Sequence, residues 1–400
     1  MALIRPFRAL RPAPEAASRV ASVPYDVVST DEARALAAGN PLSFLHVTRS
    51  EIDLPPGTDP YAAAVYAQAA RNLEELKRAA PLVLEGEPAL YFYRLRMDAH
   101  EQTGLAAAYS LDEYDRDLIK KHERTRRDKE DDRTRHIAET RAQTGVVFLT
   151  YPASAAVGAV AGRVCAGPPL YDLTAEDGVR HTVWKVTGAD MQVLVSAFAA
   201  MPALYIADGH HRAASAARVR QEIPTADTFL AVAFPDDQVQ ILAYNRVVKD
   251  LGQTAESFLQ QLRGRLTVRD GSPAPSRPGL VSMYLAGKWY ELELGRGDAP
   301  SDAADRGASL DVSRLQQQVI EPLLGIADVR TDKRIDFIGG ARGTRALEAL
   351  VDEGRAAVAF SLYPVAVRDL IAIADAGGIM PPKSTWFEPK LRDGLLVQLL

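Results

Sequence analysis

The apolar positions of this chain recur with two different periods, which predicts a fold that mixes helices and strands. Residues 60–80 carry alanine and leucine among alternating charges and predict a helix that ends at Pro81. Residues 89–96 and 103–111 alternate in the manner of two antiparallel strands. An apolar run at 146–151 predicts a buried strand.

Between residues 180 and 250 the two patterns alternate at short range. They predict a strand at 181–186, a helix at 191–200, a strand at 203–208, a helix at 210–222, and a hairpin with arms at 229–234 and 239–244. The second of these helices ends before Pro224, which cannot continue it. The hairpin would turn at Pro235-Asp-Asp237, a sequence typical of turns.

The residue composition of the chain changes beyond about Asp250. A segment rich in proline, glycine and serine covers 271–279, and another loop covers 295–309. The predicted elements are hairpin arms at 280–285 and 289–294, helices at 312–324, 344–353 and 367–376, and strands at 334–338 and 356–362. This order predicts a mixed α+β fold. We expect a catalytic core over residues 1–250 and a second α+β region over 251–400 that packs on it.

Bulk properties narrow the class of protein. Hydrophobic residues at 47% and charged residues at 25% of 400 are ordinary for a soluble globular chain. The net charge of -5 argues against a dedicated nucleic-acid binder, which is usually basic. The single cysteine, Cys165, excludes an internal disulfide and fits a reducing cytoplasm. The sequence has no signal-peptide pattern and no apolar run of membrane-spanning length, so we expect a cytoplasmic protein without membrane partners.

The densest chemistry follows the apolar run Ala203–Ala207, which leads directly into Asp208-Gly-His-His-Arg212. Glycine permits a tight strand-to-helix turn, and the N–H groups that open a helix suit phosphate. Asp208 can hold Mg²⁺ or act as a general base, and Arg212 can clamp phosphate oxygens. The two adjacent histidines point about 100° apart on a helix, which argues against a shared zinc ion. The plainer alternative is that Asp208 only caps the helix.

A second charged stretch runs from Lys120 to His136. Positive residues outnumber negative ones in it, which predicts a local anion site in an acidic protein. The same composition is typical of a solvated helix with ion pairs between successive turns. The residues assigned here to nucleotide or phosphate binding are Lys121, His122, Glu123, Thr125 and Arg133.

Two loops add candidate substrate-binding residues. The stretch 380–390 contains three prolines, two lysines and two aromatic residues, which predicts a rigid non-helical loop. Lys383, Ser384 and Thr385 in it can contact phosphate without any Walker A pattern, or the loop can act as a structural clamp. In the stretch 22–28, Tyr25 and Asp26 can face a ligand or form an Asx turn.

Several common motifs are missing from the sequence. It contains no complete dinucleotide glycine fingerprint, no serine-hydrolase elbow and no HExxH pattern. The step at Ile338-Gly-Gly340 resembles a phosphate loop only weakly. These observations argue against Rossmann-type oxidoreductases, lipase-like hydrolases and zinc proteases.

Six segments spread over nearly the whole chain carry a family resemblance. They are Arg5-Pro-Phe-Arg-Ala-Leu-Arg-Pro12, Pro24-Tyr-Asp-Val-Val28, Lys121-His-Glu-Arg-Thr125, Ala207-Asp-Gly-His-His-Arg212, Leu310-Asp-Val312 and Met380-Pro-Pro-Lys-Ser-Thr-Trp-Phe-Glu-Pro-Lys390. Together they resemble the domain of unknown function 1015 (DUF1015) family. That family is named mainly for its lack of a known function, so the resemblance by itself implies no activity.

The strand–Asp-Gly-His-His-Arg–helix unit is also similar to the central motif of the ParB and sulfiredoxin superfamily. There a Gly-x-x-Arg corner holds nucleotide phosphates, and one branch comprises free-serine kinases. The resemblance implies a ParB/sulfiredoxin-like core, with Asp208, His210 and His211 as catalytic residues and Gly209 and Arg212 as phosphate ligands. It further implies Mg²⁺ at Asp208 and ATP or ADP as phosphoryl donor. The kinases use an N-terminal glutamate as base, for which Glu15 and Asp26 are the candidates here.

The expected function is therefore a nucleotide- and Mg²⁺-dependent small-molecule kinase that phosphorylates the hydroxyl of free L-serine. Two alternatives stay open at this point. One is a ParB-like nucleotide-binding switch or regulator, although the sequence offers no convincing helix-turn-helix. The other is a phosphatase that acts on a phosphorylated small molecule at the same corner. The nucleotide, the acceptor and the oligomeric state also stay open.

Overall fold

The computed structural model describes residues 3–79, 82–295 and 306–400, and the chain forms two compact units. The first unit comprises residues 1–239 together with the C-terminal stretch 389–400, and the second comprises residues 240–388. Both mix helices and strands, so the predicted α+β fold class is confirmed. The predicted division of function between residues 1–250 and 251–400 stays a prediction.

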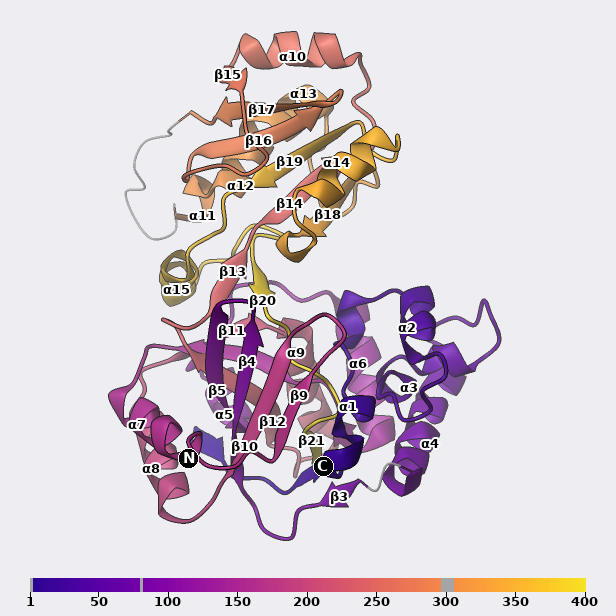
Figure 1. The fold of residues 1–400 in the computed structure, drawn as a ribbon, viewed down its shortest axis with the longest axis vertical. Helices are drawn as coiled ribbons and strands as arrows, with labels where there is room; N and C mark the ends of the chain where they lie inside the picture. The colour runs from indigo at the N-terminus through magenta and orange to yellow at the C-terminus, as the bar shows by residue number, and fades with distance from the viewer. Residues whose placement is uncertain (1–2, 80–81, 296–305) are drawn as a thin grey trace. The chain divides into compact units, whose positions relative to one another are not determined.

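The first unit is built on a nine-stranded sheet (Figure 1). Its strands in spatial order are β6 (Ile119–Lys120), β11 (Leu204–Asp208), β8 (Val147–Tyr151), β12 (Thr228–Pro235), β5 (His100–Ser110), β4 (Leu90–Met97), β10 (Arg180–Val186) and β9 (Tyr171–Thr174), with β1 (Ile4–Arg5) paired to β5. Most neighbours are antiparallel, but β11 runs parallel to β6, and β12 runs parallel to β8.

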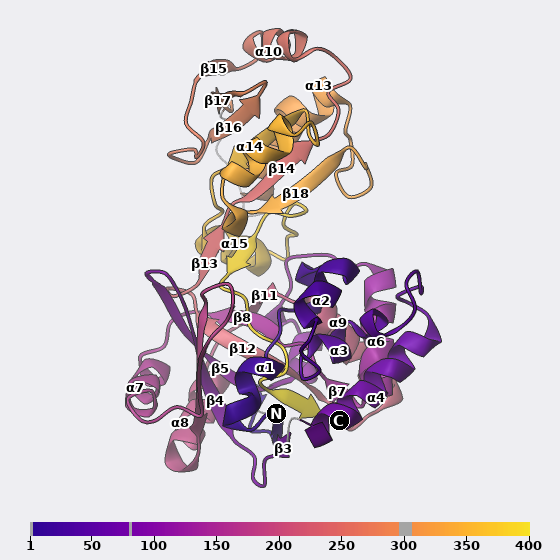
Figure 2. The ribbon, with the colours of Figure 1, turned by 45° about the vertical axis from the view of Figure 1, so that its right-hand side comes forward.

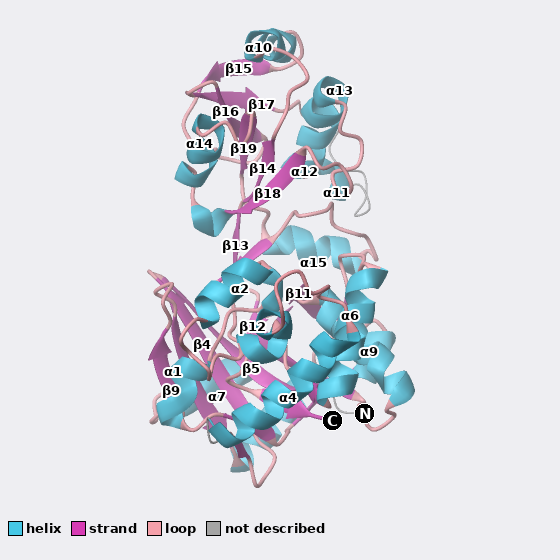
Figure 3. Ribbon diagram, turned by 90° about the vertical axis from the view of Figure 1, so that its right-hand side faces the viewer, coloured by secondary structure: helices cyan, strands magenta, loops and turns pink. Residues whose placement is uncertain are grey.

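Helices cover this sheet and complete its core. Figure 1 shows α7 (Ala155–Val164) and α8 (Gly188–Ala199) side by side, and their apolar residues join the sheet's buried cluster. Figure 3 shows α6 (Arg127–Thr140) alongside α9 (His210–Glu222), with α4 (Ala63–Ala79) against α6. The remaining helices of this unit are η1 (Pro14–Ala16), α1 (Ala17–Val20), η2 (Tyr25–Val27), α2 (Thr30–Ala37), α3 (Leu45–Thr48), η3 (Ser50–Asp53) and α5 (Leu111–Asp115).

A second, small sheet anchors the C-terminal stretch in the first unit. Its strands in order are β3 (Val83–Leu84), β2 (Ala9–Arg11), β21 (Val397–Leu399) and β7 (Ala142–Gln143). Because β21 pairs with a strand on each side, the last residues of the chain are fixed beside segments that lie far away in the sequence.

The second unit contains a six-stranded sheet in which every pairing is antiparallel. Its strands in order are β15 (Thr267–Asp270), β17 (Lys288–Glu293), β16 (Leu280–Leu285), β19 (Val358–Leu362), β14 (Tyr244–Val248) and β18 (Ile335–Gly339). A two-stranded sheet joins β13 (Gln240–Leu242) to β20 (Trp386–Glu388). The helices are α10 (Ala255–Arg263), α11 (Arg306–Ser309), α12 (Asp311–Leu315), η4 (Gln316–Ile320), α13 (Glu321–Leu324), η5 (Gly340–Arg342), α14 (Arg345–Asp352) and α15 (Val367–Asp375).

Figure 2 shows α14 beside β16 within this second unit. The helix packs on β16 and β19, where Leu347 contacts Tyr284 and Ala359. The predicted helix at 312–324 is confirmed as one helical run with a π turn in its middle, and it ends at Gly325 in the left-handed conformation. The loop predicted at 295–309 lies mostly outside the described residues.

The predicted hairpin with arms at 229–234 and 239–244 is wrong. The first arm forms β12, which already pairs with β5 on one side and with β8 on the other. No edge of β12 is left for the second arm, so β13 pairs with β20 instead. The turn at Pro235 therefore leads out of the first unit rather than back along the same sheet.

Among the helices in the described ranges, none combines the length and the apolar character needed to cross a bilayer.

Candidate functional site

The strand-to-helix corner forms as the sequence predicts. The buried strand β11 ends at Asp208, and α9 begins at His210. Gly209 between them has φ +95°, in the left-handed region that favours glycine. A Cβ at Gly209 would lie 3.3 Å from Arg212 Nη1 and 3.4 Å from Val147 Cα. The corner therefore needs glycine both for its backbone conformation and for the close passage of Arg212.

Replacing Gly209 with alanine should destabilise the chain by about 1–2 kcal/mol, because an L-residue in the left-handed conformation is strained. Gly39 is the matched control, since its φ is +72° but no atom lies within 4 Å of a Cβ built there. Urea unfolding of both variants separates backbone strain from crowding. Equal losses in the two variants would mean that contact with Arg212 contributes nothing at Gly209.

Arg212 is the central buried cation of the site. Its Nη2 donates to both carboxylate oxygens of Asp26, at 3.0 and 2.8 Å, and its Nη1 donates to the Val146 carbonyl. The stem packs on Gly145, where a Cβ would lie 3.2 Å from Arg212 Cδ. Burial alone would lower the pKa of Arg212, but the carboxylates of Asp26 and Asp208 raise it well above its usual value. Arg212 is therefore permanently charged.

Tyr25 lies near two guanidinium groups. Its ring centroid is 4.1 Å from the guanidinium carbon of Arg133 and 5.8 Å from that of Arg212. Arg133 Nε also pairs with Asp132 Oδ2 at 2.9 Å. Burial raises the pKa of Tyr25 far above its usual value, so the phenol stays neutral. A cavity of about 20 Å³, with room for about one water molecule, is lined by Tyr25, Arg133, His136, Thr144, Gly145 and Arg212 among others.

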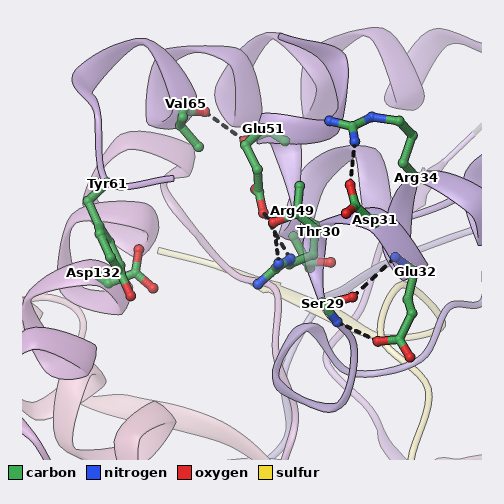
Figure 4. A network of polar contacts seen from close by, with 12 residues as sticks. Ser29, Thr30, Asp31, Glu32, Arg34, Arg49, Glu51, Tyr61, Val65 and Asp132 are labelled. Carbon is green, nitrogen blue, oxygen red and sulfur yellow. Dashed lines mark hydrogen bonds and ion pairs between the residues drawn. The ribbon is translucent and has the colours of Figure 1, made fainter. Parts of the chain in front are cut away.

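The segment that carries Tyr25 and Asp26 leads into the next helix, α2, and Figure 4 shows the polar contacts at the start of that helix. Ser29 accepts from the Glu32 N–H, and Glu32 accepts from the Ser29 N–H at 2.8 Å, which makes a capping box. Arg49 donates to Thr30 Oγ1 at 2.8 Å and pairs with Glu51 at 3.0 Å. These contacts fix the start of α2, a few residues after Asp26.

Asp208 contacts a residue from the C-terminal stretch. Lys390 Nζ lies 2.8 Å from Asp208 Oδ2, with side-chain exposures of 14% for Lys390 and 29% for Asp208. Burial would raise the pKa of Asp208, but the positive charges of Lys390 and Arg212 lower it far below its usual value. Asp208 is therefore ionised at any physiological pH and is a weak base.

The two histidines of the motif contact different parts of the loop at 121–126. His210 Nε2 accepts from the His122 N–H at 3.5 Å, and the His122 and His210 rings meet edge to face at 4.4 Å. His210 Nδ1 lies 3.7 Å from Glu123 Oε2. His211 Nε2 accepts from the Arg126 N–H at 3.0 Å. The histidines thus diverge, as their adjacency in a helix implies.

His210 and His122 are neutral groups. Burial lowers the pKa of His122 to about 4, and burial together with the neighbouring His122 lowers that of His210 well below its usual value. In the described ranges, no three His, Cys, Asp or Glu side chains gather closely enough to hold a metal ion by themselves. A Mg²⁺ ion needs only one or two protein carboxylates when substrate phosphates and water complete its shell. Asp208 fits that role.

The structure brings together only part of the predicted site. Tyr25, Asp26, Arg133 and the Asp208–Arg212 corner form one cluster, and His122 and Glu123 adjoin it. Lys121 instead donates to the Tyr114 carbonyl at 3.1 Å and lies 3.7 Å from Asp117. Thr125 donates to Glu130, and Glu15 is exposed on η1. Lys383, Ser384 and Thr385 belong to the second unit, where Lys383 Nζ lies 5.5 Å from the Tyr244 ring centroid.

Sequence reasoning missed two residues of the cluster, Lys390 and Asp393. Lys390 is the last residue of the proline-rich motif at 380–390, so the sequence marks its segment but not its role. Asp393 is 1% exposed, and its Oδ1 accepts from the Val146 N–H at 3.4 Å. Nothing in the local sequence marks it, because its neighbours come from distant segments.

Comparison with known proteins identifies the family. A family model described as a protein of unknown function (DUF1015) matches residues 4–313. The chain belongs to the DUF1015 family. The DUF1015 resemblance stated from the sequence is thereby confirmed. No curated protein matches this DUF1015 chain by sequence.

Three solved structures illustrate what the DUF1015 chain is similar to. A conserved hypothetical protein from Pyrococcus furiosus is 15% identical, with a TM-score of 0.35, and the match covers 71% of this chain and 93% of that one. A free serine kinase in complex with AMP is 15% identical, with a TM-score of 0.37, covering 71% and 89%. SbnI with C-terminal truncation from Staphylococcus aureus is 13% identical, with a TM-score of 0.40, covering 74% and 87%. At these TM-scores the likeness assigns no activity to the chain.

Proposed function

We propose that this chain is a nucleotide- and Mg²⁺-dependent kinase that transfers a phosphoryl group to the hydroxyl of a small amino acid, free L-serine. The observation that carries the proposal is the corner itself. It places the ionised Asp208, the charged Lys390 and Arg212 next to the first N–H groups of α9. The serine acceptor and the ATP or ADP donor rest on the similarity of the Asp-Gly-His-His-Arg motif to that of the free-serine kinases.

Phosphoryl transfer suits this arrangement because the reaction depends mainly on positioning and on neutralising charge. The N–H groups at the start of α9 and the positive end of its dipole would hold phosphate oxygens. When bound, Mg²⁺ would neutralise charge that develops on the phosphates. Asp208 would hold that ion, since its carboxylate is ionised and weakly basic.

The neutral histidines would act through hydrogen bonds rather than charge. Since His210 Nε2 accepts from the loop N–H of His122, the proton of the neutral ring lies on Nδ1, on the side of Glu123. His211 binds the Arg126 N–H in the same way. Together they would hold the loop at 121–126 against the corner and so shape the phosphate site.

The test is ³¹P NMR of the purified chain with Mg²⁺, ATP or ADP, and a pool of amino acids that includes serine. We expect a new phosphomonoester signal that disappears in Asp208→Asn, and omission of one acceptor at a time identifies the substrate. Asp172→Asn is the matched control, because Asp172 pairs with Arg180 on a different strand pair and should leave turnover unchanged.

Two outcomes would contradict the kinase. Intact nucleotide with no new signal for any acceptor would favour a ParB-like nucleotide-binding switch. Release of phosphate from phosphoserine without nucleotide would favour a phosphatase at the same corner.

A further inference from the structure

The C-terminal stretch is held rigidly in the first unit. Strand β21 pairs on both sides, and Ser22 and Asp393 exchange backbone hydrogen bonds of 3.1 and 2.9 Å. The Arg392 N–H donates to Tyr93 Oη at 3.3 Å. Lys390 precedes these anchored residues by only a few positions, so the position of its backbone is fixed as well.

Lys390 extends from this anchored stretch to the strand-to-helix corner. Its ammonium lies 2.8 Å from the Asp208 carboxylate, and both side chains are partly accessible. Each partner keeps part of its surface in contact with solvent, so an incoming anion can reach the ammonium and compete with the carboxylate for it.

Two buried polar atoms beside the pair have no hydrogen-bond partner within the described part of the chain. They are Nδ1 of His122, whose side chain is 2% exposed, and Nε of Arg212, whose residue is 7% exposed. His122 contacts the first residue of α9, and Arg212 lies in the first turn of the same helix near Asp208. Buried polar atoms usually have partners, so these two point to a ligand at the corner.

We propose that Lys390 is the phosphate-binding lysine of this corner and exchanges the Asp208 carboxylate for an oxygen of a bound polyphosphate. This inference deepens the proposed function and rests on it for the nucleotide as the natural source of that polyphosphate. A lysine suits the task because its ammonium is a point charge with three donors on a flexible stem. No covalent step is involved.

Isothermal titration with sodium tripolyphosphate, without Mg²⁺ and at constant ionic strength, tests the proposal. Lys390→Met should weaken binding by about tenfold to a hundredfold, the value of a charged hydrogen bond. Lys390→Arg should retain part of the affinity. Lys185→Met is the matched control. Lys185, on β10, forms a similar ion pair with Glu85, and the variant should bind tripolyphosphate as the wild type does.

The Asp208→Asn variant shows whether Lys390 binds phosphate itself or only positions Asp208. If Lys390 only positions Asp208, removal of either partner weakens binding equally. If Lys390 binds phosphate, Asp208→Asn binds tripolyphosphate at least as tightly as the wild type, because a competing negative charge is gone. Thermal unfolding of each variant verifies that it is folded.

The proposal is overturned if Lys390→Met binds tripolyphosphate like the wild type, if both substitutions weaken binding equally, or if the wild type does not bind it. Failure of the kinase is a separate result. Tripolyphosphate binding that depends on Lys390, with no ³¹P signal of a phosphorylated acceptor, would support this inference and contradict the kinase.

Discussion

Replacing Arg212 with methionine should destabilise the chain by about 3 kcal/mol and abolish phosphate binding at the corner. Methionine fills part of the space of the stem but removes the bonds to Asp26 and to the Val146 carbonyl. It also removes the positive charge that helps to lower the pKa of Asp208. The loss is at the lower end for a buried pair because the Asp26 side chain is 36% exposed and can be hydrated. Urea unfolding and tripolyphosphate titration measure the two effects.

Arg180→Met is the control for a generic loss of an ion pair. Arg180 pairs with Asp172 at the surface, so its removal should leave the free energy of unfolding nearly unchanged. Arg212→Lys keeps the charge, but its single ammonium cannot bond Asp26 and Val146 in the same geometry. It should recover part of the binding and little of the stability. Equal stability of the Arg212→Met and Arg180→Met variants would show that the buried pair contributes nothing.

Much of the fold follows from the period of the apolar residues and from the glycine and proline residues that end helices and strands. The helix at 210–222 has the predicted bounds because Gly209 ends the strand and Pro224 stops the helix. The strands at 89–96 and 103–111 pair as predicted, because a hairpin brings local neighbours together. The four-stranded sheet was not predictable in this way. Its strands have two or three residues each, too few to show a period, and they come from four separate parts of the chain.

The site, like the fold, has a part that the sequence shows and a part that only the structure shows. The corner from Asp208 to Arg212 is contiguous, so its residue types and its turn were visible in the sequence. Its partners were not, since Asp26 lies 186 positions from Arg212 and Lys390 lies 182 positions from Asp208. Such pairs form only when the sheets bring distant segments together. The charge of Asp208 shows the consequence. From the sequence Asp208 can hold Mg²⁺ or act as a general base, and the low pKa that Lys390 and Arg212 give its carboxylate favours the first role.

Asp393 should make the stability of the chain fall as pH rises toward neutrality. Burial raises the pKa of Asp393 to about 7 from the usual 3.8, and the negative charge of Asp26 adds to this, whereas Arg212 and Arg133 oppose it. The folded chain therefore binds this proton more tightly than the unfolded chain. The stabilisation is complete below about pH 4 and is lost as pH rises through about 7.

Asp393→Asn removes this titration while keeping the shape of the side chain and the acceptor for the Val146 N–H. Between about pH 5 and about pH 8 the free energy of unfolding of the wild type should fall by about 3 kcal/mol relative to that of the variant. Urea unfolding at several pH values across this window measures the difference. Asp172→Asn is the control, because its pairing with Arg180 lowers the pKa of that carboxyl and places its titration below the window.

Parallel pH profiles of Asp393→Asn and the wild type would contradict this prediction. If the free energy of unfolding of the wild type instead falls relative to that of Asp393→Asn as pH rises, the C-terminal stretch carries a proton at mildly acid pH. Loss of that proton adds a further negative charge beside Arg212, which already pairs with Asp26 and lies near the Asp208 carboxylate. Arg212 is then shared among three carboxylates, and its attraction for phosphate weakens. Tripolyphosphate affinity should therefore also fall through about pH 7 in the wild type and not in Asp393→Asn.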